Sequence, residues 1–424
     1  MRRSIILTIS LFATMFANNI KAQSTLESLQ GDGTTGNPYK ISSVADLRTL
    51  SAYVMTAEDY STNTQGKNFI MTNDIRFTEA DLIYDFDGDG VAESNFIPIG
   101  GRKDSVTPSD YRLFQGLFNG NGYSIFGLRI KYSGVNYVGL FGSTWGAIIG
   151  RFGIQDAEIS GGGSVGSICG ILNSRGMVIE CFARNCTING TFLYVGGLIG
   201  ATYSNSFVAG CYVTGTNVTG TDFCGGFLGN NGTDCLILNA YSTASVATTT
   251  NSTYYGGFCG YSTIDSTMSE CYFIDTWQAT DSVEPGLYSM KGTIMTDEAM
   301  KESSFVSILQ SVDEETVFWG QDIHNVNYGF PVFSAENALS DVISDNAIAV
   351  FPNPASQTIF INIDNNDMKG AKVVILDLLG RTVMSKNISG TSTQCDISSL
   401  SPSSYIVTIV QNGRTTARKQ IIKK

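Results

Sequence analysis

Tyr137-Val-Gly-Leu-Phe-Gly142 is the first of five glycine-bounded phrases that recur between Tyr137 and Gly260. The later copies read Val-Gly-Ser-Ile-Cys-Gly170, Val-Gly-Gly-Leu-Ile-Gly200, Cys-Gly-Gly-Phe-Leu-Gly229 and Tyr-Gly-Gly-Phe-Cys-Gly260. Their closing glycines are 28, 30, 29 and 31 residues apart. A fixed period of this length is typical of solenoids and propellers.

A second phrase recurs with the same period as the glycine phrases. A small residue followed by an aromatic one stands at Cys181, Cys211, Ala240 and Cys271, at intervals of 30, 29 and 31 residues. The segments between are short, β-rich and separated by turn residues, and none has helical periodicity. The pattern predicts an all-β protein whose main domain is a right-handed parallel β-helix, with like residues stacked in ladders at about 4.8 Å per coil.

The repeats also resemble a known family. Val195-Gly-Gly-Leu-Ile-Gly200 and Cys224-Gly-Gly-Phe-Leu-Gly229, with the phrase between them, resemble the GLUG-motif repeats of bacterial surface proteins, which include adhesins and the flanks of some secreted peptidases. The resemblance extends from about Tyr123 to Asp275. It implies an architecture and leaves the activity to be argued from a site.

The two ends of the repeat array have their own signatures. Residues 1–22 have the layout of a secretory signal peptide, and no later stretch has the ~20 apolar residues of a membrane-spanning helix. Ser43 to Met55 has helical periodicity after a capping signal and predicts a helical N-terminal cap. We therefore expect a capped β-helix over residues 23–335 and a linker over 336–347. A helix is expected to start at Thr296, and the aromatic residues of Phe318-Trp319 and Tyr328 to Phe333 are suited to closing the far end.

Residues 348–424 differ in pattern from the rest. Alternating strands predict a small C-terminal β-sandwich. Phe351-Pro-Asn-Pro354, Leu376 to Val383 and the terminal Lys419 to Lys424 together resemble the C-terminal sorting domain of type IX secretion cargo. The resemblance implies that the type IX secretion machinery carries the protein across the outer membrane. The protein would then be extracellular or displayed on the cell surface.

The formal charge also separates these parts. Residues 23–345 contain 14 Lys and Arg against 34 Asp and Glu, whereas residues 346–424 contain 9 against 4. An acidic solenoid is unsuited to nucleic acid, whose binding requires clustered cations. The nine cysteines, three of which share a column with Ala240, are expected to be mostly buried free thiols.

Catalytic constellations are scarce in this sequence. His324 is the one histidine of the chain, which is too few for a metal site with several histidine ligands. A Ser-His-Asp triad would have to use this one histidine, which lies in the capping region. Carboxylate pairs such as Asp156 with Glu158, or Glu180 with its coil neighbours, remain candidates for glycoside chemistry. A lyase would also need a cation, and none stands between Gly190 and Lys291. We lean towards a protein without catalytic activity.

Aromatic residues give a better candidate for binding. Two positions before the first glycine of each phrase stand Tyr137, Ser164, Tyr194, Phe223 and Tyr254. Such a column of rings suits the face of a sugar or a protein surface. The alternative is that the rings stack only to stabilise the coils. Trp145, Tyr203 and Tyr261 follow the closing glycines and are further candidates, which we expect to be exposed.

An acidic stretch resembles an ion-binding loop. Asp85, Asp87, Asp89, Val91 and Glu93 occupy positions 1, 3, 5, 7 and 9 of an Asp-x-Asp-x-Asp-Gly pattern. In this pattern the carboxylates converge on Ca²⁺, Gly90 permits the sharp bend, and Val91 offers its backbone carbonyl. Position 12 is Phe96 instead of glutamate, which excludes an ordinary EF-hand. The alternative is a solvated acidic turn.

Together these patterns predict a secreted, surface-displayed and non-catalytic binding protein. Its partner would be an extracellular glycan or a host or bacterial surface protein. Two alternatives remain open: a polysaccharide lyase or glycoside hydrolase on a β-helix scaffold, and a structural component of a surface layer.

Overall fold

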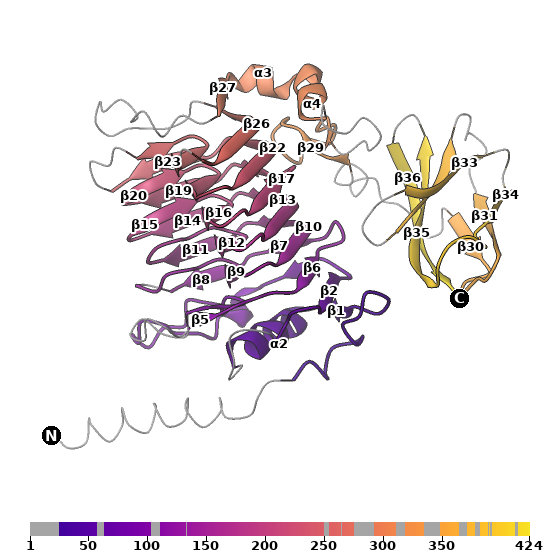
Figure 1. Ribbon diagram of the computed structural model, residues 1–424, viewed down its shortest axis with the longest axis horizontal. Helices are drawn as coiled ribbons and strands as arrows, with labels where there is room; N and C mark the ends of the chain where they lie inside the picture. The colour runs from indigo at the N-terminus through magenta and orange to yellow at the C-terminus, as the bar shows by residue number, and fades with distance from the viewer. Residues whose placement is uncertain are drawn as a thin grey trace. The chain divides into compact units, whose positions relative to one another are not determined.

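The structure is a computed structural model, drawn in Figure 1. It describes residues 25–56, 63–102, 111–132, 134–249, 254–263, 265–274, 292–310, 319–334, 348–363, 371–377, 382–388, 390, 392–411 and 414–424. The predicted signal peptide and linker lie outside these ranges. The chain forms two compact units, the larger containing Pro38–Met295 and the smaller Thr296–Lys424.

The larger unit is a parallel β-solenoid, as the repeats predict (Figure 1). Its largest sheet follows the order β1-β2-β6-β10-β13-β17-β22-β26-β27, with β3, β7 and β18 paired beside this path. The strands of this sheet are β1 (Tyr39–Ile41), β2 (Asn68–Met71), β3 (Ile75–Arg76), β6 (Leu117–Asn119), β7 (Ser124–Phe126), β10 (Ile148–Gln155), β13 (Met177–Arg184), β17 (Phe207–Ala209), β18 (Tyr212–Thr214), β22 (Leu236–Ser242), β26 (Thr267–Ile274) and β27 (Thr293–Met295).

Three further parallel sheets complete the coils. One contains β8 (Arg129–Lys131), β11 (Glu158–Gly161), β14 (Thr187–Gly190), β19 (Asn217–Gly220) and β23 (Ser245–Thr248). The next contains β9 (Phe141–Ser143), β12 (Cys169–Leu172), β16 (Ile199–Thr202), β21 (Leu228–Asn231) and β25 (Cys259–Ser262). The last contains β15 (Leu193–Gly196), β20 (Asp222–Gly225) and β24 (Tyr255–Gly256). A separate antiparallel pair is formed by β4 (Gly101–Arg102) and β5 (Tyr111–Arg112).

The register of these sheets follows the sequence period. Cys181 pairs with Phe152 of the preceding coil, and Ala240 pairs with Cys271 of the following one. Cys181 and Cys211 are fully buried and in contact, because the Cys181 backbone N–H donates to Cys211 Sγ at 3.4 Å. Burial raises the pKa of the Cys211 thiol to about 12, which keeps it protonated and unreactive. All nine cysteines are buried free thiols.

Each coil turns at corners where the backbone is left-handed. One column of such corners contains Glu180, Asn239 and Glu270, with φ of 56°, 49° and 51°. Another contains Asp156 and Asn185, with φ of 55° and 56°. Asparagine and aspartate adopt this conformation more readily than most residues, which explains why turn residues recur once per coil.

The closing glycine of each phrase allows close contact between coils. A Cβ atom placed on Gly229 would lie 2.6 Å from the carbonyl carbon of Tyr194 and 2.6 Å from the amide nitrogen of Val195, both in the preceding coil. Gly170, Gly200 and Gly260 meet the equivalent peptide one coil earlier. Real Cβ atoms do not approach backbone atoms this closely, so only glycine fits at these positions.

Replacing Gly229 with alanine should therefore destabilise the solenoid, because the added methyl group displaces the backbone of the coil beneath it. The cost should be about 1–3 kcal/mol or more, as for other overpacked interiors. Thermal unfolding followed by circular dichroism measures it. Gly36→Ala is the control, because nothing lies within 4 Å of a Cβ atom there. Equal melting temperatures for the two variants would contradict this account of the glycine phrase.

The N-terminal end of the solenoid is covered by helix α2 (Val44–Met55), as predicted. Ser43 caps the helix by accepting a hydrogen bond from the Asp46 N–H at 3.2 Å. The Asp46 carboxylate accepts from Ser42 rather than from Ser43, so the expected reciprocal capping box is displaced by one residue. Leu47 and Leu50 are fully buried in the core shared with the first coils.

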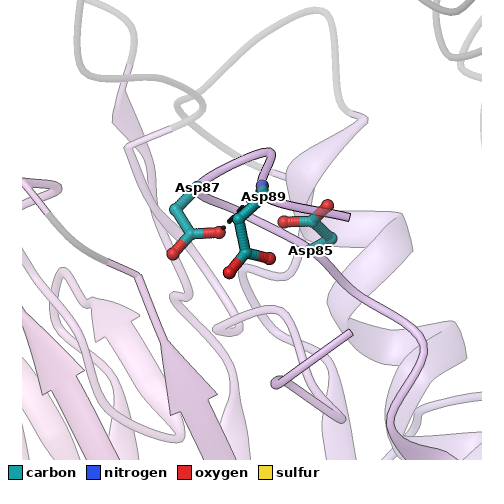
Figure 2. A group of neighbouring side chains, drawn as sticks. All are labelled: Asp85, Asp87 and Asp89. Carbon is teal, nitrogen blue, oxygen red and sulfur yellow. Dashed lines mark hydrogen bonds between the residues drawn. The ribbon is translucent and has the colours of Figure 1, made fainter. Parts of the chain in front are cut away.

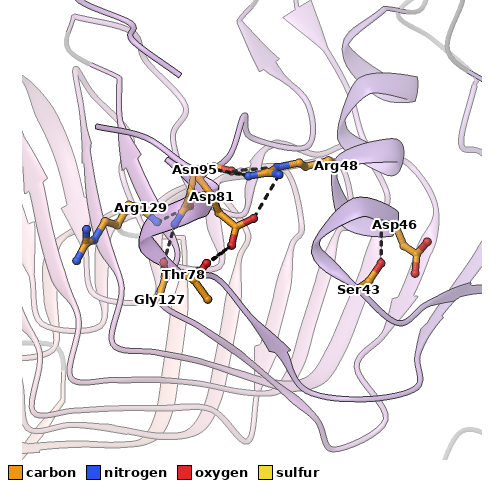
Figure 3. Close-up of polar contacts among 8 residues, drawn as sticks. All are labelled: Ser43, Asp46, Arg48, Thr78, Asp81, Asn95, Gly127 and Arg129. Carbon is orange, nitrogen blue, oxygen red and sulfur yellow. Dashed lines mark hydrogen bonds and ion pairs between the residues drawn. The ribbon is translucent and has the colours of Figure 1, made fainter. Parts of the chain in front are cut away.

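Arg48 connects this helix to the insertion, which comprises residues 77–100 between strands β3 and β4. Its guanidinium donates to the carbonyl oxygens of Asp81 and Asn95, both at 2.8 Å, and pairs with the Asp81 carboxylate at 3.4 Å (Figure 3). Asn95 in turn donates to the Gly127 carbonyl and accepts from the Arg129 N–H, both at 2.8 Å. The cap, the insertion and the first coils are thus connected by directional bonds. A short 3₁₀ helix, η1 (Glu79–Asp81), lies within the insertion.

The smaller unit is mostly antiparallel. Its first part contains α3 (Asp297–Lys301), α4 (Ser303–Leu309) and the pair β28 (Trp319–Gly320) and β29 (Val332–Phe333). Thr296 caps α3 as predicted, although the helix breaks at Glu302. The remainder forms two sheets, β30 (Ile348–Phe351), β31 (Thr358–Ile363) and β34 (Ser392–Asp396), and β33 (Thr382–Asn387), β32 (Lys372–Leu376), β35 (Ser403–Gln411) and β36 (Arg414–Lys423).

Both of these sheets contribute to one core. Ile359 and Cys395 from the first sheet cluster with Val373, Val407 and Ile421 from the second, and all five are fully buried. The two sheets therefore pack as the small sandwich that the alternating pattern predicts. Strand β34 was not predicted, because its alternation of Thr393 and Cys395 with polar residues is short and weak.

Candidate functional site

The predicted aromatic column is assembled by the stacking of coils. Tyr137, Ser164, Tyr194 and Phe223 all have left-handed backbones, with φ of 66°, 51°, 66° and 53°. This conformation is rare for bulky residues. Ring centroids lie 5.1 Å apart for Tyr194 and Phe223, and 4.8 Å apart for Phe223 and Tyr254. The rings are half-buried, so part of each faces solvent.

The column extends further than the sequence indicated. Tyr111 contacts Tyr137 with centroids 5.5 Å apart, and the Arg102 guanidinium lies 5.5 Å from the centre of the Tyr111 ring. Burial, together with a hydrogen bond to Tyr111, raises the pKa of Tyr137 to about 12. Tyr111 precedes Tyr137 by 26 residues. This near-period spacing was the signal that could have revealed it.

The three additional aromatic candidates differ in their surroundings. Trp145 is 51% exposed, as expected. Tyr203 and Tyr261 are half-buried, so the expectation that both are exposed was wrong, because each packs against the column. Tyr261 meets the edges of Phe223 and Tyr254, at centroid distances of 5.4 and 5.6 Å. Burial and a hydrogen bond with Tyr194 raise the pKa of Tyr203.

The acidic loop brings three carboxylates together. The ligand oxygens of Asp85, Asp87 and Asp89 lie within 4.8 Å of one another, and all three residues are exposed (Figure 2). Oxygens that share one Ca²⁺ at about 2.4 Å can be no more than about 4.8 Å apart, so this spacing is compatible with the ion. Hydrogen bonds from the Gly88 and Gly90 N–H groups hold the pKa of Asp85 below its ordinary value.

The two remaining predicted ligands are placed differently. The Glu93 carboxylate accepts a hydrogen bond from Lys131 Nζ at 2.7 Å and is not part of the carboxylate group. Val91 is 57% exposed, and its N–H donates to the Asp89 carboxylate at 2.8 Å. The loop is anchored by Phe86, whose ring stacks on Tyr132 at 4.3 Å. Calcium binding remains a prediction that rests on the three aspartates.

Calcium at millimolar concentration should raise the melting temperature of the protein and release or absorb heat in calorimetry. Asp87→Ala should abolish both effects, because it removes the central carboxylate. Glu93→Gln is the matched control and should retain both, because Glu93 already pairs with Lys131. The absence of any heat or shift with the wild-type protein would leave only a solvated acidic turn.

Each of the carboxylates considered for catalysis has a polar partner. Glu180 pairs with Arg151 at 3.2 Å, and burial raises its pKa. Asp156 accepts from the Asn185 amide at 3.3 Å. Glu158 lies 3.9 Å from the Arg129 guanidinium. His324 is exposed in the smaller unit. Each of these acidic groups is held by its own partner on the solenoid surface.

Comparison with known proteins identifies the tail. Residues 349–423 match the family model of the secretion system C-terminal sorting domain. The tail is a type IX sorting domain. The protein is therefore secreted to the cell surface or beyond, as the tail residues indicated. Within the part of the chain that the structure describes, no helix is long and apolar enough to span a membrane.

Two further comparisons found similar proteins. Over 180 residues the protein is 33% identical to halomucin of Haloquadratum walsbyi (strain DSM 16790 / HBSQ001). This match covers 42% of the chain but only 2% of halomucin. A crystal structure titled "putative immunoglobulin A1 protease" from Bacteroides ovatus aligns with a TM-score of 0.48 and 17% identity, covering 72% of this chain and 94% of that one.

Deleting residues 348–424 should leave the secreted protein trapped in the periplasm, because the sorting domain is the part that the secretion machinery recognises. Cell fractionation and protease accessibility measure its location. The same residues fused to a periplasmic reporter should export the reporter, which provides the control. Normal surface display of the truncated protein would contradict the role assigned to this domain.

Proposed function

We propose that the solenoid is a non-catalytic binding scaffold, an adhesin built from GLUG-type repeats, that recognises an extracellular glycan through its aromatic column. The observation that carries this proposal is the row formed by Tyr194, Phe223 and Tyr254, where half-buried rings stack at the coil spacing. Stacked rings with exposed portions provide an extended platform for the C–H faces of sugars.

The choice of residue at these corners supports a role beyond folding. Other left-handed corners in the solenoid contain Asn185, Gly210 and Asp156, which suit the turn, or charged residues such as Arg151 and Glu180, which pair with each other. A bulky residue in this conformation costs roughly 1–2 kcal/mol. Ring stacking returns about 0.5–1.5 kcal/mol per pair, which does little more than offset that cost. Selection for stability alone would therefore favour asparagine or glycine at least as well.

Tyrosine hydroxyls supply the polar contacts that a glycan would need. Tyr137 belongs to the column, and Tyr203 lies beside it and shares a hydrogen bond with Tyr194. Burial raises the pKa of both hydroxyls, so they remain protonated across the physiological range. A neutral hydroxyl both donates and accepts, as sugar hydroxyls do.

Tyr194→Ala should weaken binding to a glycan array at least tenfold, because it removes the middle of the row. Phe192→Ala is the matched control: Phe192 is in the same coil and 58% exposed but is not part of the column. It should bind as the wild type does. Tyr194→Gly should lose binding equally while destabilising the fold less than Tyr194→Ala, because glycine adopts φ of 66° without strain.

Three results would contradict the proposal. The first is equal binding by Tyr194→Ala and Phe192→Ala. The second is binding that requires only a protein on the target cell and no glycan, which would favour a protein partner. The third is release of reducing ends from a polysaccharide, which would favour the enzymatic alternative.

A further inference from the structure

A second candidate site lies at the N-terminal end of the solenoid, separate from the aromatic column. A cavity of about 520 Å³, wide open to solvent on one side, lies there between the first described residues, strand β1 and helix α2. Its lining includes Glu27, Asp32, Tyr39, Tyr53 and Lys67. The volume lies within the range of about 300–1,000 Å³ that is usual for small-molecule sites.

The outer wall of this cavity is held in place. Leu29 is buried in the solenoid core and anchors the segment. The Gln30 carbonyl accepts from the Lys40 N–H at 2.7 Å, and the Gly33 carbonyl accepts from the Asn68 N–H at 2.9 Å. These bonds connect the wall to β1 and to β2. The cavity is therefore preformed, which lowers the entropy cost of binding a ligand.

Two tyrosine rings are fixed in the cavity. Tyr39 stacks on Phe69 of the neighbouring strand, with centroids 5.5 Å apart. The Tyr53 hydroxyl donates to the Asn63 carbonyl at 3.1 Å, and the Asn63 amide donates to the Tyr53 carbonyl at 3.1 Å. Burial, together with the nearby Tyr39, raises the pKa of Tyr53. Both rings present apolar surface that needs no rearrangement to meet a ligand.

The charged groups of the cavity are available for hydrogen bonding. Neither the Glu27 carboxylate nor the half-buried Lys67 ammonium makes a hydrogen bond or ion pair with any residue that the structure describes. Asp32 accepts from the Thr34 N–H and hydroxyl, at 2.9 and 2.7 Å, and both Asp32 and Glu27 are exposed at the rim. Acceptors and a donor therefore line the cavity without neutralising one another.

We propose that this cavity binds a neutral pyranose sugar. Sugar hydroxyls donate to carboxylates such as Glu27 and Asp32 and accept from an ammonium such as Lys67, so one ligand satisfies all three. The tyrosine rings cover the C–H surface. An anionic ligand is disfavoured by two carboxylates against one ammonium, and an apolar ligand would displace water from the Glu27 carboxylate and the Lys67 ammonium without replacing its hydrogen bonds.

The test uses the full-length secreted protein and saturation-transfer NMR titrations. The probes are D-glucose, D-galactose, D-mannose and N-acetyl-D-glucosamine, with D-glucuronate as the charged comparator. At least one neutral sugar should bind more tightly than D-glucuronate. Glu27→Gln and Lys67→Met should each weaken that binding about tenfold, because each removes a charged hydrogen-bonding partner. Their melting temperatures should be unchanged, because neither side chain has a partner within the protein.

Two control variants make the outcome specific. Lys40→Met removes an exposed ammonium outside the cavity and should not alter sugar binding. Tyr194→Ala should also leave binding of the free sugars unchanged, so failure of the column and failure of the cavity are distinguishable. The proposal is overturned if the wild type binds none of the neutral sugars, if D-glucuronate binds best, or if Glu27→Gln and Lys67→Met both bind normally.

Discussion

The contact of each closing glycine with a peptide of the preceding coil is the constraint on which the solenoid depends. Gly229 lies on the peptide between Tyr194 and Val195, where even a methyl group would collide with backbone atoms. The same contact recurs in successive coils, so it fixes the distance and the register between them. Once that register is set, the apolar and small residues of every coil superimpose as ladders inside the core.

The same contact of glycine with peptide also positions the residues of the aromatic column. The peptide beneath each glycine belongs to the left-handed corner residue, whose backbone is covered by the next coil while its side chain points away. Stacking of Phe223 on Tyr254 at 4.8 Å reproduces the spacing of neighbouring strands. The rings therefore form a regular surface as a direct consequence of how the coils pack. Forming this row of rings therefore costs little free energy beyond the backbone strain at the left-handed corners.

The sorting domain and the solenoid differ in formal charge. The sorting domain carries an excess of cations, whereas the solenoid carries a large excess of acids. The acidic surface favours solubility outside the cell and disfavours nucleic acid and anionic ligands. Both proposed sites agree with that charge, because tyrosine rings and hydroxyl-bonding carboxylates suit neutral sugars. The calcium prediction fits as well, since the Asp85 loop concentrates the same negative charge at one place.

Local patterns in the sequence determined the fold class. The glycine period, the column of Cys181 and Ala240 and the capping signal at Ser43 each encode a repeating or local interaction, so periodicity alone predicted the coils and the helix. The tail residues likewise predicted the sandwich and its sorting role.

Tertiary structure decided what depends on residues from different coils or distant segments. It joined Tyr111 to the column, turned Glu93 towards Lys131 and packed Tyr261 against Phe223. It also formed an open cavity lined by Glu27 and Lys67, which are 40 residues apart in a sequence without any motif to connect them. Such contacts arise from packing between segments, and packing leaves no periodic trace in a single sequence.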